Sequence, residues 1–375
     1  MLNRSELADI QLMLDHGGDP TKSNKENRWT ALRSFAWQGE DIDALNLLLA
    51  YNKNGASPDI NAHDSKGNTP LHVLLLRREV PELLLEAFVR LGANVNEEDR
   101  YSVRPLQMAC LYGGLDTLRI LFLSEIVKID DEDDEGNTAL QQAAIGNHTD
   151  CVKFLLEKKA QPNVPNHFGR VALHNAALYG TRECLQILLT HGATPNIADK
   201  HDRTPLFCAC LTVATEDNAN SLVDSLLRIN LPLSKINLPT RSRRTPLREA
   251  AAHGFEYVVE RLIQRAQASN DIDSLLLNEQ DTQKGMTPLH RAAWLGKTGC
   301  VRLLLTATVD DKLRTCVALR NNDGKTALTL AYEQWALANH QTAFEEIVSL
   351  LVDTDPVVAA ADPELVAVCA TNGNL

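Results

Sequence analysis

Residues 287–296 read TPLHRAAWLG, and related strings recur along almost the whole chain. The leucine of each string, Leu289 in this copy, is a fixed point for comparing the copies. Nine such leucines follow one another, at positions 32, 71, 106, 140, 173, 206, 247, 289 and 328. The spacings between them are 39, 35, 34, 33, 33, 41, 42 and 39 residues. The shortest spacing defines a repeated unit of 33 residues, and the longer spacings indicate loop insertions.

Each unit predicts two consecutive helices. Pro precedes the leucine in several units, and Pro is tolerated in the first helical turn because no intrahelical hydrogen bond is lost there. Small residues such as Ala292 and Ala293 follow at positions +3 and +4 from the leucine, which allows neighbouring helices to approach closely. Residues that tolerate the left-handed turn at a helix end stand at +7: Gly39, Gly113, Gly180, Gly254, Gly296 and, in the fourth unit, Asn147. A second segment with apolar residues at helical spacing then begins, as in residues 300–309.

This pattern resembles the ankyrin repeat, in which a turn or hairpin finger precedes two antiparallel helices. Residues 69–72 and 287–290 both read TPLH, which is the family's opening motif. The resemblance extends over about residues 28–353. It implies an all-α fold, namely an ankyrin-repeat solenoid of stacked helix pairs with hairpin or turn fingers.

The repeat also suggests how the chain is divided. We expect residues 1–27 to form an N-terminal partial repeat that caps the array, and residues 28–353 to form nine ankyrin-like repeats. Residues 354–375 align with the first helix of a tenth unit and form either a capping half-repeat or a truncated repeat. The insertions predict irregular stacking near residues 211–245 and 266–285.

Composition excludes several classes of protein. The 37 Lys and Arg residues and 49 Asp and Glu residues give a formal net charge of −12, which argues against a protein that binds phosphate backbones. No apolar run approaches the roughly 18 residues of a membrane span, and the first ten residues lack the apolar core of a secretion signal. Eight cysteines are too few for a disulfide scaffold. We therefore expect a monomer that resides in the cytoplasm, the nucleus or both, is not secreted, and contacts neither nucleic acid nor membrane directly.

The cysteines recur in register with the repeat. Cys151, Cys184 and Cys300 stand at +11 from their leucines, and Cys110 and Cys210 stand at +4. Residues that keep a structural register are expected to pack in the core, where a thiol behaves as a small apolar group. The cysteines therefore predict neither a metal site nor a nucleophile.

The histidines lead to the same conclusion. His72, His174 and His290 all stand at +1, and the family resemblance implies that they form hydrogen bonds between finger and helix.

Residues 296–298 and 324–326 both read GKT but lack the glycine that a phosphate-binding loop needs five residues earlier. The sequence thus predicts no catalytic residue, no cofactor and no metal ion.

A row of apolar side chains is the strongest candidate for a binding surface. In the ankyrin family, the residues at +5 and +6 point into a concave groove, and eight of the nine +5 residues here are uncharged and apolar. We predict a groove for a partner protein, formed by Trp37, Leu76, Leu111, Tyr112, Ile145, Leu178, Tyr179 and Trp294. The alternative is that these residues are buried against the neighbouring helix. Solvent exposure of the four aromatic residues at positions 37, 112, 179 and 294 distinguishes the two.

Charged clusters suggest additional contacts. Residues 130–135 are six consecutive acidic residues, which predict either a solvated finger or a contact for a Lys- and Arg-rich partner segment. A basic cluster lies in and after the finger of the seventh unit and consists of Arg241, Arg243, Arg244 and Arg248. The candidate electrostatic contacts are Asp131, Asp133, Asp134, Arg241, Arg243 and Arg244.

These features together predict a non-enzymatic scaffold or adaptor that binds other proteins through a preorganised surface. One alternative is a nuclear transcriptional co-regulator that acts by binding transcription factors. Another is the regulatory fragment of a larger enzyme, which the unfinished tenth unit suggests. Fold alone does not choose among these roles.

Overall fold

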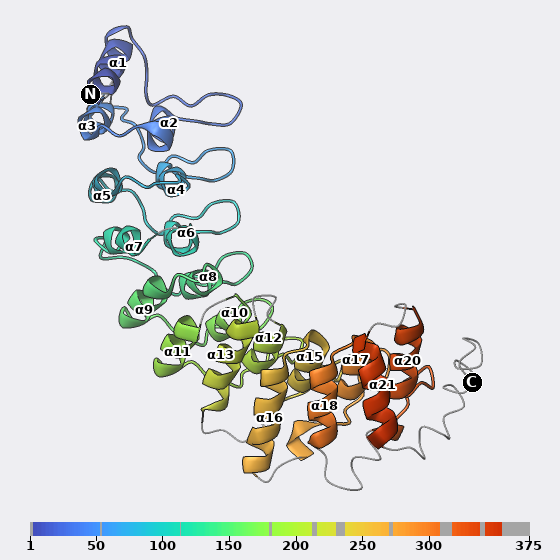
Figure 1. Ribbon diagram of the computed structural model, residues 1–375. Coiled ribbons are helices and arrows are strands. Elements are labelled where there is room, and N and C mark those ends of the chain that lie inside the picture. Colours follow the sequence, from blue (N-terminus) through green and yellow to red (C-terminus); the bar gives the residue numbers. More distant parts are fainter. Residues whose placement is uncertain are drawn as a thin grey trace. The chain divides into compact units, whose positions relative to one another are not determined.

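The computed structural model describes residues 3–52, 55–112, 114–179, 182–211, 216–229, 237–269, 273–307, 317–337 and 342–354. These ranges contain helices joined by turns and no strand, as Figure 1 shows. The predicted half-repeat at residues 354–375 lies outside them, apart from Thr354. The predicted helix-ending residues Gly113 and Gly180 also lie outside the described residues.

The chain divides into two compact units, of which unit 1 comprises Met1–Ala176 and Thr190–Ala193. Its first helices are α2 (Ala31–Gln38), α4 (Pro70–Leu75), α6 (Pro105–Tyr112) and α8 (Ala139–Ile145). Its second helices are α3 (Ile42–Ala50), α5 (Glu82–Arg90), α7 (Leu115–Leu121) and α9 (Thr149–Glu157), preceded by the N-terminal helix α1 (Asn3–Asp15). We call the segment that connects a second helix to the next first helix a finger; four of them project as loops in the blue-to-green part of Figure 1.

Unit 2 comprises Ala177–Leu189 and Thr194–Leu375. Its first helices are α12 (Pro205–Leu211), α15 (Pro246–His253), α17 (Pro288–Trp294) and α20 (Ala327–Leu337). Its second helices are α13 (Glu216–Leu227), α16 (Glu256–Ala268), α18 (Thr298–Thr306) and α21 (Thr342–Thr354), with a short 3-10 turn η1 (Asp273–Leu275). The division between the units falls in α10 (Ala172–Tyr179) and α11 (Arg182–Thr190).

Every first helix begins at the residue before its aligned leucine, as the repeat predicts. Within unit 1, the first helices α2, α4, α6 and α8 pack in sequence, and the second helices α1, α3, α5, α7 and α9 do the same. Within unit 2, α12, α15, α17 and α20 form one row and α13, α16, α18 and α21 another. The aligned leucines and the small residues at +3 and +4 are buried between these rows, so the core is continuous along each unit.

In several repeats, the side chain at +1 connects the first helix to the following finger. The backbone N–H of Thr69 donates to Nδ1 of His72 (3.2 Å), so Nε2 of His72 carries the proton and donates to the carbonyl oxygen of Val103 (3.1 Å). His290 makes the equivalent contact with the carbonyl oxygen of Lys325 (3.2 Å). The structural role that the family resemblance implies for these two histidines is therefore confirmed.

In the third and fourth repeats, glutamine stands at +1 from the aligned leucine. Nε2 of Gln107 donates to the carbonyl oxygen of Asn137 (2.9 Å), and Nε2 of Gln141 donates to that of Arg170 (2.5 Å). The third histidine, His174, is also buried, and its Nδ1 accepts from the backbone N–H at position 171 (3.2 Å). An amide and an imidazole thus perform one structural task, because each offers an acceptor near the helix start and a donor towards the next finger.

Of the four predicted helix-ending residues at +7 that the structure describes, three follow the prediction. Gly254 (φ 82°), Gly296 (φ 70°) and Asn147 (φ 56°) adopt the left-handed conformation. Gly39 does not, because its φ is −76° and its backbone is extended. A side chain at Gly39 would place Cβ 2.5 Å from the ring of Phe35, so lack of space explains the glycine there.

The expected irregular stacking near residues 211–245 and 266–285 is not observed in the described residues. The helix α12 packs on α15 and α13 packs on α16, in the same way as elsewhere in unit 2. Part of the additional length extends the second helices, since α13 has 12 residues and α16 has 13, compared with 9 in α3 and α5. Another part forms η1, whose Leu275 is fully buried. The described parts of the insertions therefore lengthen second helices or form η1 and leave the helix contacts intact.

Candidate functional site

The eight residues predicted to form the groove are all exposed or half-buried. Tyr112 is 66% exposed, Tyr179 54% and Trp37 51%, while Trp294 is half-buried. Burial against the neighbouring helix is therefore wrong for these aromatic residues. Exposed aromatic side chains at recurring positions form surfaces that suit partner recognition.

In unit 1, three of the predicted residues line a single hollow of about 320 Å³. Leu76 directly follows α4, and Leu111 and Tyr112 come from α6. The finger before α6 contributes Tyr101, and the buried side chain of Met108 forms part of the lining. We call this hollow the unit-1 groove. Its apolar lining and its width on the scale of one or two side chains suit the insertion of a partner's side chain.

Sequence reasoning missed two aromatic residues on the fingers. Tyr101 is 61% exposed and lines the unit-1 groove, and Phe168 is also exposed. Each stands five residues before its aligned leucine, at positions 106 and 173. Comparison of the finger residues in the same register would have identified them.

The other predicted groove residues are distributed over both units. Trp37 and Ile145 belong to unit 1, whereas Leu178, Tyr179 and Trp294 belong to unit 2. In unit 2, the ring of Trp294 lies 5.0 Å from Cζ of Arg291 and 5.4 Å from Nζ of Lys284. Trp294 thus combines an aromatic surface with two neighbouring positive charges.

The acidic finger is only partly solvated. Asp133 is buried; its Oδ1 accepts from the backbone N–H groups of Glu135 and Asn137 (2.9 and 2.8 Å), and its Oδ2 accepts from Nε2 of Gln142 (2.9 Å). The prediction that Asp133 contacts a partner is therefore wrong, because its carboxylate closes the turn of its own finger. This side chain has the same task as an Asx-turn aspartate.

The remaining charged candidates are on the surface and most of them are ion-paired. Asp131 is half-buried and pairs with Nε of Arg104 (3.1 Å), whereas Asp134 is exposed. Arg241 pairs with Asp202 (3.1 Å), Arg243 pairs with Glu279 (2.6 Å), and Arg244 pairs with Glu249 (2.5 Å). An exposed pair such as that of Arg241 and Asp202 contributes little to stability, whereas Glu249 is buried.

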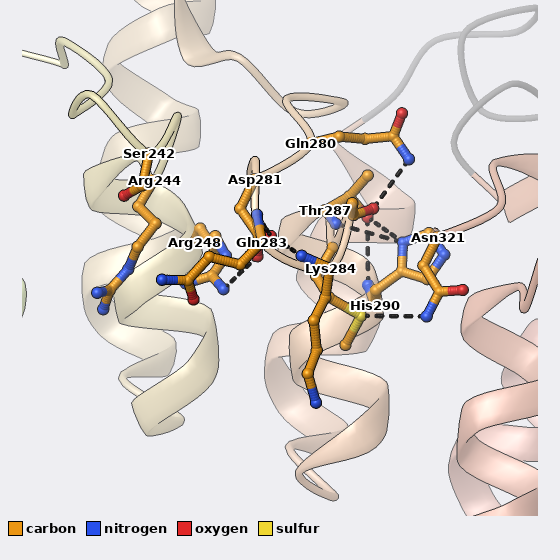
Figure 2. A network of polar contacts seen from close by, with 12 residues as sticks. Ser242, Arg244, Arg248, Gln280, Asp281, Gln283, Lys284, Thr287, His290 and Asn321 are labelled. Atoms are coloured by element: carbon orange, nitrogen blue, oxygen red, sulfur yellow. Dashed lines mark hydrogen bonds and ion pairs between the residues drawn. The ribbon is translucent and has the colours of Figure 1, made fainter. Parts of the chain in front are cut away.

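A buried ionic network connects the seventh and eighth repeats, and Figure 2 shows Arg244, Arg248 and Asp281 of this network. Arg248 stands at +1 from its leucine, where other units have His or Gln, and it is 5% exposed. Its Nη2 donates to Oδ2 of Asp281 (2.5 Å), and its Nη1 donates to Oε1 of Glu249 (2.6 Å). Arg244 also donates to both oxygens of Glu249, at 2.9 and 2.5 Å. Arg248 therefore connects helix and finger as His72 does elsewhere, but through charges.

Both carboxylates of this network are stabilised in their ionised form. Burial alone would raise the pKa of Glu249, but the hydrogen bond and charge of Arg244 lower that pKa below its ordinary value. Burial also opposes ionisation of Asp281, but the backbone N–H of Lys284 and the charge of Arg248 lower its pKa. The network is therefore charged at neutral pH.

The histidines and cysteines that the sequence predicts to be structural are buried, and burial shifts their pKa values. Burial lowers the pKa of His72 and lowers that of His290 to about 4, so both rings are neutral at physiological pH. Burial raises the pKa of Cys151 to about 11 and that of Cys184 to about 12. Six cysteines of the described residues are buried: Cys110, Cys151, Cys184, Cys208, Cys210 and Cys300. Such thiols pack as small apolar groups, as predicted.

The described ranges contain neither a metal site nor a membrane span. They contain no group of three or more His, Cys, Asp or Glu side chains placed to hold a metal ion. They also contain no helix of sufficient length and hydrophobicity to cross a membrane.

Sequence models of known families match most of the repeat region. A model described as ankyrin repeats in many copies matches residues 106–156 and 140–189. A second model, described as ankyrin repeats in three copies, matches residues 211–315 and 270–362. Together these matches cover more than half of the chain.

Curated relatives share this region. The chain is 26% identical over 151 residues to ankyrin repeat and SOCS box protein 2 of Bos taurus, over 39% of this chain and 23% of that protein. It is 27% identical over 203 residues to the nuclear factor NF-kappa-B p105 subunit of Gallus gallus, over 54% of this chain and 16% of that protein. The chain thus spans less than a quarter of the length of these relatives.

Solved structures agree in fold. The ankyrin repeat domain of Bcl-3, described as a unique member of the IkappaB protein family, is 25% identical, with a TM-score of 0.50 over 63% of this chain and 99% of that one. The ankyrin repeat domain of human ASB11 is 24% identical, with a TM-score of 0.51 over 66% of this chain and 97% of that one, and shows the fold alone. With its helix pairs beginning at each aligned leucine, the chain belongs to the ankyrin repeat family.

Proposed function

We propose that this chain is a non-enzymatic scaffold or adaptor that binds partner proteins through the exposed side chains of its first helices and fingers. Ankyrin repeat domains generally mediate protein–protein interactions, and a stacked array presents a preorganised surface that loses little entropy on binding. The observation that carries the proposal is the unit-1 groove, where exposed Tyr101, Tyr112 and Leu76 surround a hollow of about 320 Å³.

The composition of this groove favours a protein ligand. Tyrosine side chains offer a large apolar face together with a hydroxyl group, and such residues dominate the energetics of protein interfaces. Lys66 and Asp99 at its edge supply charges of both signs. An apolar centre with a polar rim is the common arrangement of specific interfaces.

The test compares a groove variant with a control variant that alters an exposed apolar residue outside the groove. Leu76→Ser/Tyr112→Ala alters the unit-1 groove, whereas Leu83→Ser alters an exposed leucine of the second helix α5. Proteins captured from a cell extract by the wild-type chain are quantified by mass spectrometry for each variant. Circular dichroism and thermal unfolding verify that all three proteins are folded.

We expect the groove variant to lose one set of partners by about ten-fold or more, as truncation of central anchors does at other interfaces. The Leu83→Ser variant is expected to retain those partners. Equal recovery by all three proteins, or loss with Leu83→Ser alone, contradicts the proposed surface.

A nuclear transcriptional co-regulator is a second candidate for the specific role. It is favoured by the similarity to the NF-kappa-B p105 subunit, whose name identifies a nuclear factor, and to the Bcl-3 domain. This role requires the tagged chain to accumulate in the nucleus and to capture a transcription factor that Leu76→Ser/Tyr112→Ala no longer captures. A chain that is excluded from the nucleus contradicts it.

A further inference from the structure

Arg291 on α17 is a half-buried arginine without an acidic partner in the described part of the chain. Its guanidinium group lies over the ring of Trp294, with Cζ 5.0 Å from the ring centroid. Its Nε is buried and makes no hydrogen bond. A guanidinium group that is partly removed from water and not paired with an anion is unfavourable unless a ligand supplies the missing charge.

The nearest carboxylates are already engaged. Oε1 of Glu249 accepts from Arg244 and Arg248, and its Oε2 accepts from Arg244. Oδ2 of Asp281 accepts from Arg248, and its Oδ1 accepts from the backbone N–H of Lys284. Two arginines therefore use the charges of both acids, and the charge of Arg291 is left in excess.

A second unpaired cation lies on the same aromatic ring. The side chain of Lys284 extends beside α17 in Figure 2, and its Nζ lies 5.4 Å from the ring of Trp294. Within the described residues, this amino group has no ion pair. Trp294, Arg291 and Lys284 thus form a compact group with two uncompensated positive charges around one aromatic side chain, which we call the Trp294 site.

The electrostatics of the surroundings agree with this geometry. Burial lowers the pKa of Arg291, and the positive charge of Arg248 lowers it further. The chain as a whole has a net charge of −12, so an excess of positive charge at this position is local. An incoming anion would offset the cost of desolvation that the arginine already bears.

We propose that the Trp294 site binds a carboxylate side chain of an acidic partner segment, with an apolar neighbour of that carboxylate packed on the indole ring. The inference rests on the proposed function and specifies the chemistry of a partner. Arginine suits this task because its planar group donates two parallel hydrogen bonds to a carboxylate.

A nucleic acid fits the site less well. Binding to a phosphate backbone depends on several neutralised phosphates, and the Trp294 site offers two cations. The ion-paired carboxylates of Glu249, Asp281 and Glu333 lie on the same and neighbouring units and would repel a polyanion. One or two separate carboxylates on a peptide match the available charge.

The experiment uses defined probes and the full chain. A fluorescein-labelled hexapeptide of alternating Glu and Leu is titrated against the protein by fluorescence polarisation at low ionic strength. The alternating Gln and Leu peptide tests the requirement for charge, and a six-nucleotide single-stranded DNA tests the nucleic-acid alternative. The variants are Arg291→Gln and Lys284→Gln. The control is Arg302→Gln on α18, the second helix of the eighth repeat.

We expect the acidic peptide to bind and the Gln peptide to bind at least about ten-fold more weakly, which corresponds to the loss of one charge-assisted interaction. Arg291→Gln and Lys284→Gln are each expected to weaken binding several-fold, and Arg302→Gln, which removes the same charge from an exposed pair with Glu346, is expected to retain it. Binding should weaken as salt is added.

Three results would overturn the inference: no binding of the acidic peptide, equal weakening by Arg302→Gln, or preferential binding of the DNA. Thermal unfolding of each variant establishes that it is folded. The unit-1 groove variant Leu76→Ser/Tyr112→Ala is included in the same titration and is expected to bind the acidic peptide normally. A negative result for the Trp294 site therefore does not affect the partner-capture test of the proposed function. A negative result in the partner-capture test likewise does not affect the peptide titration.

Discussion

Nη2 of Arg248 donates to Oδ2 of Asp281 over 2.5 Å, and this ion pair occupies the place where several other repeats have a neutral hydrogen bond. In those units, His72 or His290 reaches the carbonyl oxygen of the following finger. The seventh unit has changed the chemistry of this connection while its geometry is retained. Loss of one partner of a neutral hydrogen bond leaves no buried charge. Loss of one partner of a buried ion pair leaves the other charge buried without compensation.

Replacement of Asp281 by Asn is therefore expected to destabilise unit 2 strongly. The variant leaves Arg248 buried without one of its two carboxylates, and loss of one partner of a buried pair costs about 3 kcal/mol or more. Denaturant unfolding measures the effect. Glu346→Gln, which breaks the exposed pair with Arg302, is the matched control and should change stability little. Equal effects of the two substitutions would show that the buried ion pair contributes no more to the free energy of unfolding than the exposed pair does.

The pH dependence of stability follows from His290, whose pKa burial lowers to about 4. Between that value and the ordinary pKa of about 6.5, the unfolded chain binds more protons than the folded chain, so stability falls as the pH decreases through this window. From pH 7 to pH 5, this residue accounts for a loss of about 2 kcal/mol. Urea unfolding at the two pH values measures it.

The chain itself supplies the control for this prediction. Gln107 and Gln141 perform the same structural task without titrating between pH 4 and 7. His290→Gln is therefore expected to fold and to lose less stability between pH 7 and pH 5 than the wild type. An identical loss in both proteins would exclude His290 as the origin.

The six buried cysteines are expected to resist modification in the folded protein. Burial raises the pKa of Cys151 to about 11 and that of Cys184 to about 12, and the thiolate is the reactive form. A Cys316→Ser/Cys369→Ser variant leaves only the six described thiols. Ellman's reagent at pH 8 should label none of them before unfolding and six in denaturant; rapid labelling of the native protein would contradict their placement.

Arg291→Gln is expected to leave the free energy of unfolding unchanged or to raise it. The substitution removes a half-buried charge that has no acidic partner among the described residues, so no favourable ion pair is lost. Denaturant unfolding measures the change. Clear destabilisation would reveal that Arg291 has a structural counter-ion.

Much of the fold could be predicted because it is repeated. The aligned leucines fix the helix starts to the residue, since the same Pro and Thr signals recur before them. The in-register cysteines and the histidines at +1 indicated packing and hydrogen bonding for the same reason. A residue type that recurs at one position reflects contacts within a single repeat, and the sequence of that repeat contains all the residues involved.

What could not be predicted depends on which side chains meet in three dimensions. Arg248 belonged to an apparent basic cluster, and its partner Asp281 lies 33 residues further along the chain. Asp133 stood in an acidic run that gave no sign of which carboxylate closes the finger. Gly39 was expected to be left-handed, but the ring of Phe35 is what requires a glycine there. The groove candidates were found from their register, whereas Tyr101 was missed because the fingers were not compared in the same way.

Site-specific photocrosslinking tests the central claim most directly. The photoreactive residue p-benzoylphenylalanine replaces Tyr112 in the unit-1 groove in one protein and Leu83 on α5 in another. After irradiation in cells, the account predicts discrete crosslinked partner proteins from position 112 and none of these from position 83. Crosslinks from position 83 with none from position 112 would contradict partner binding by the first helices and fingers.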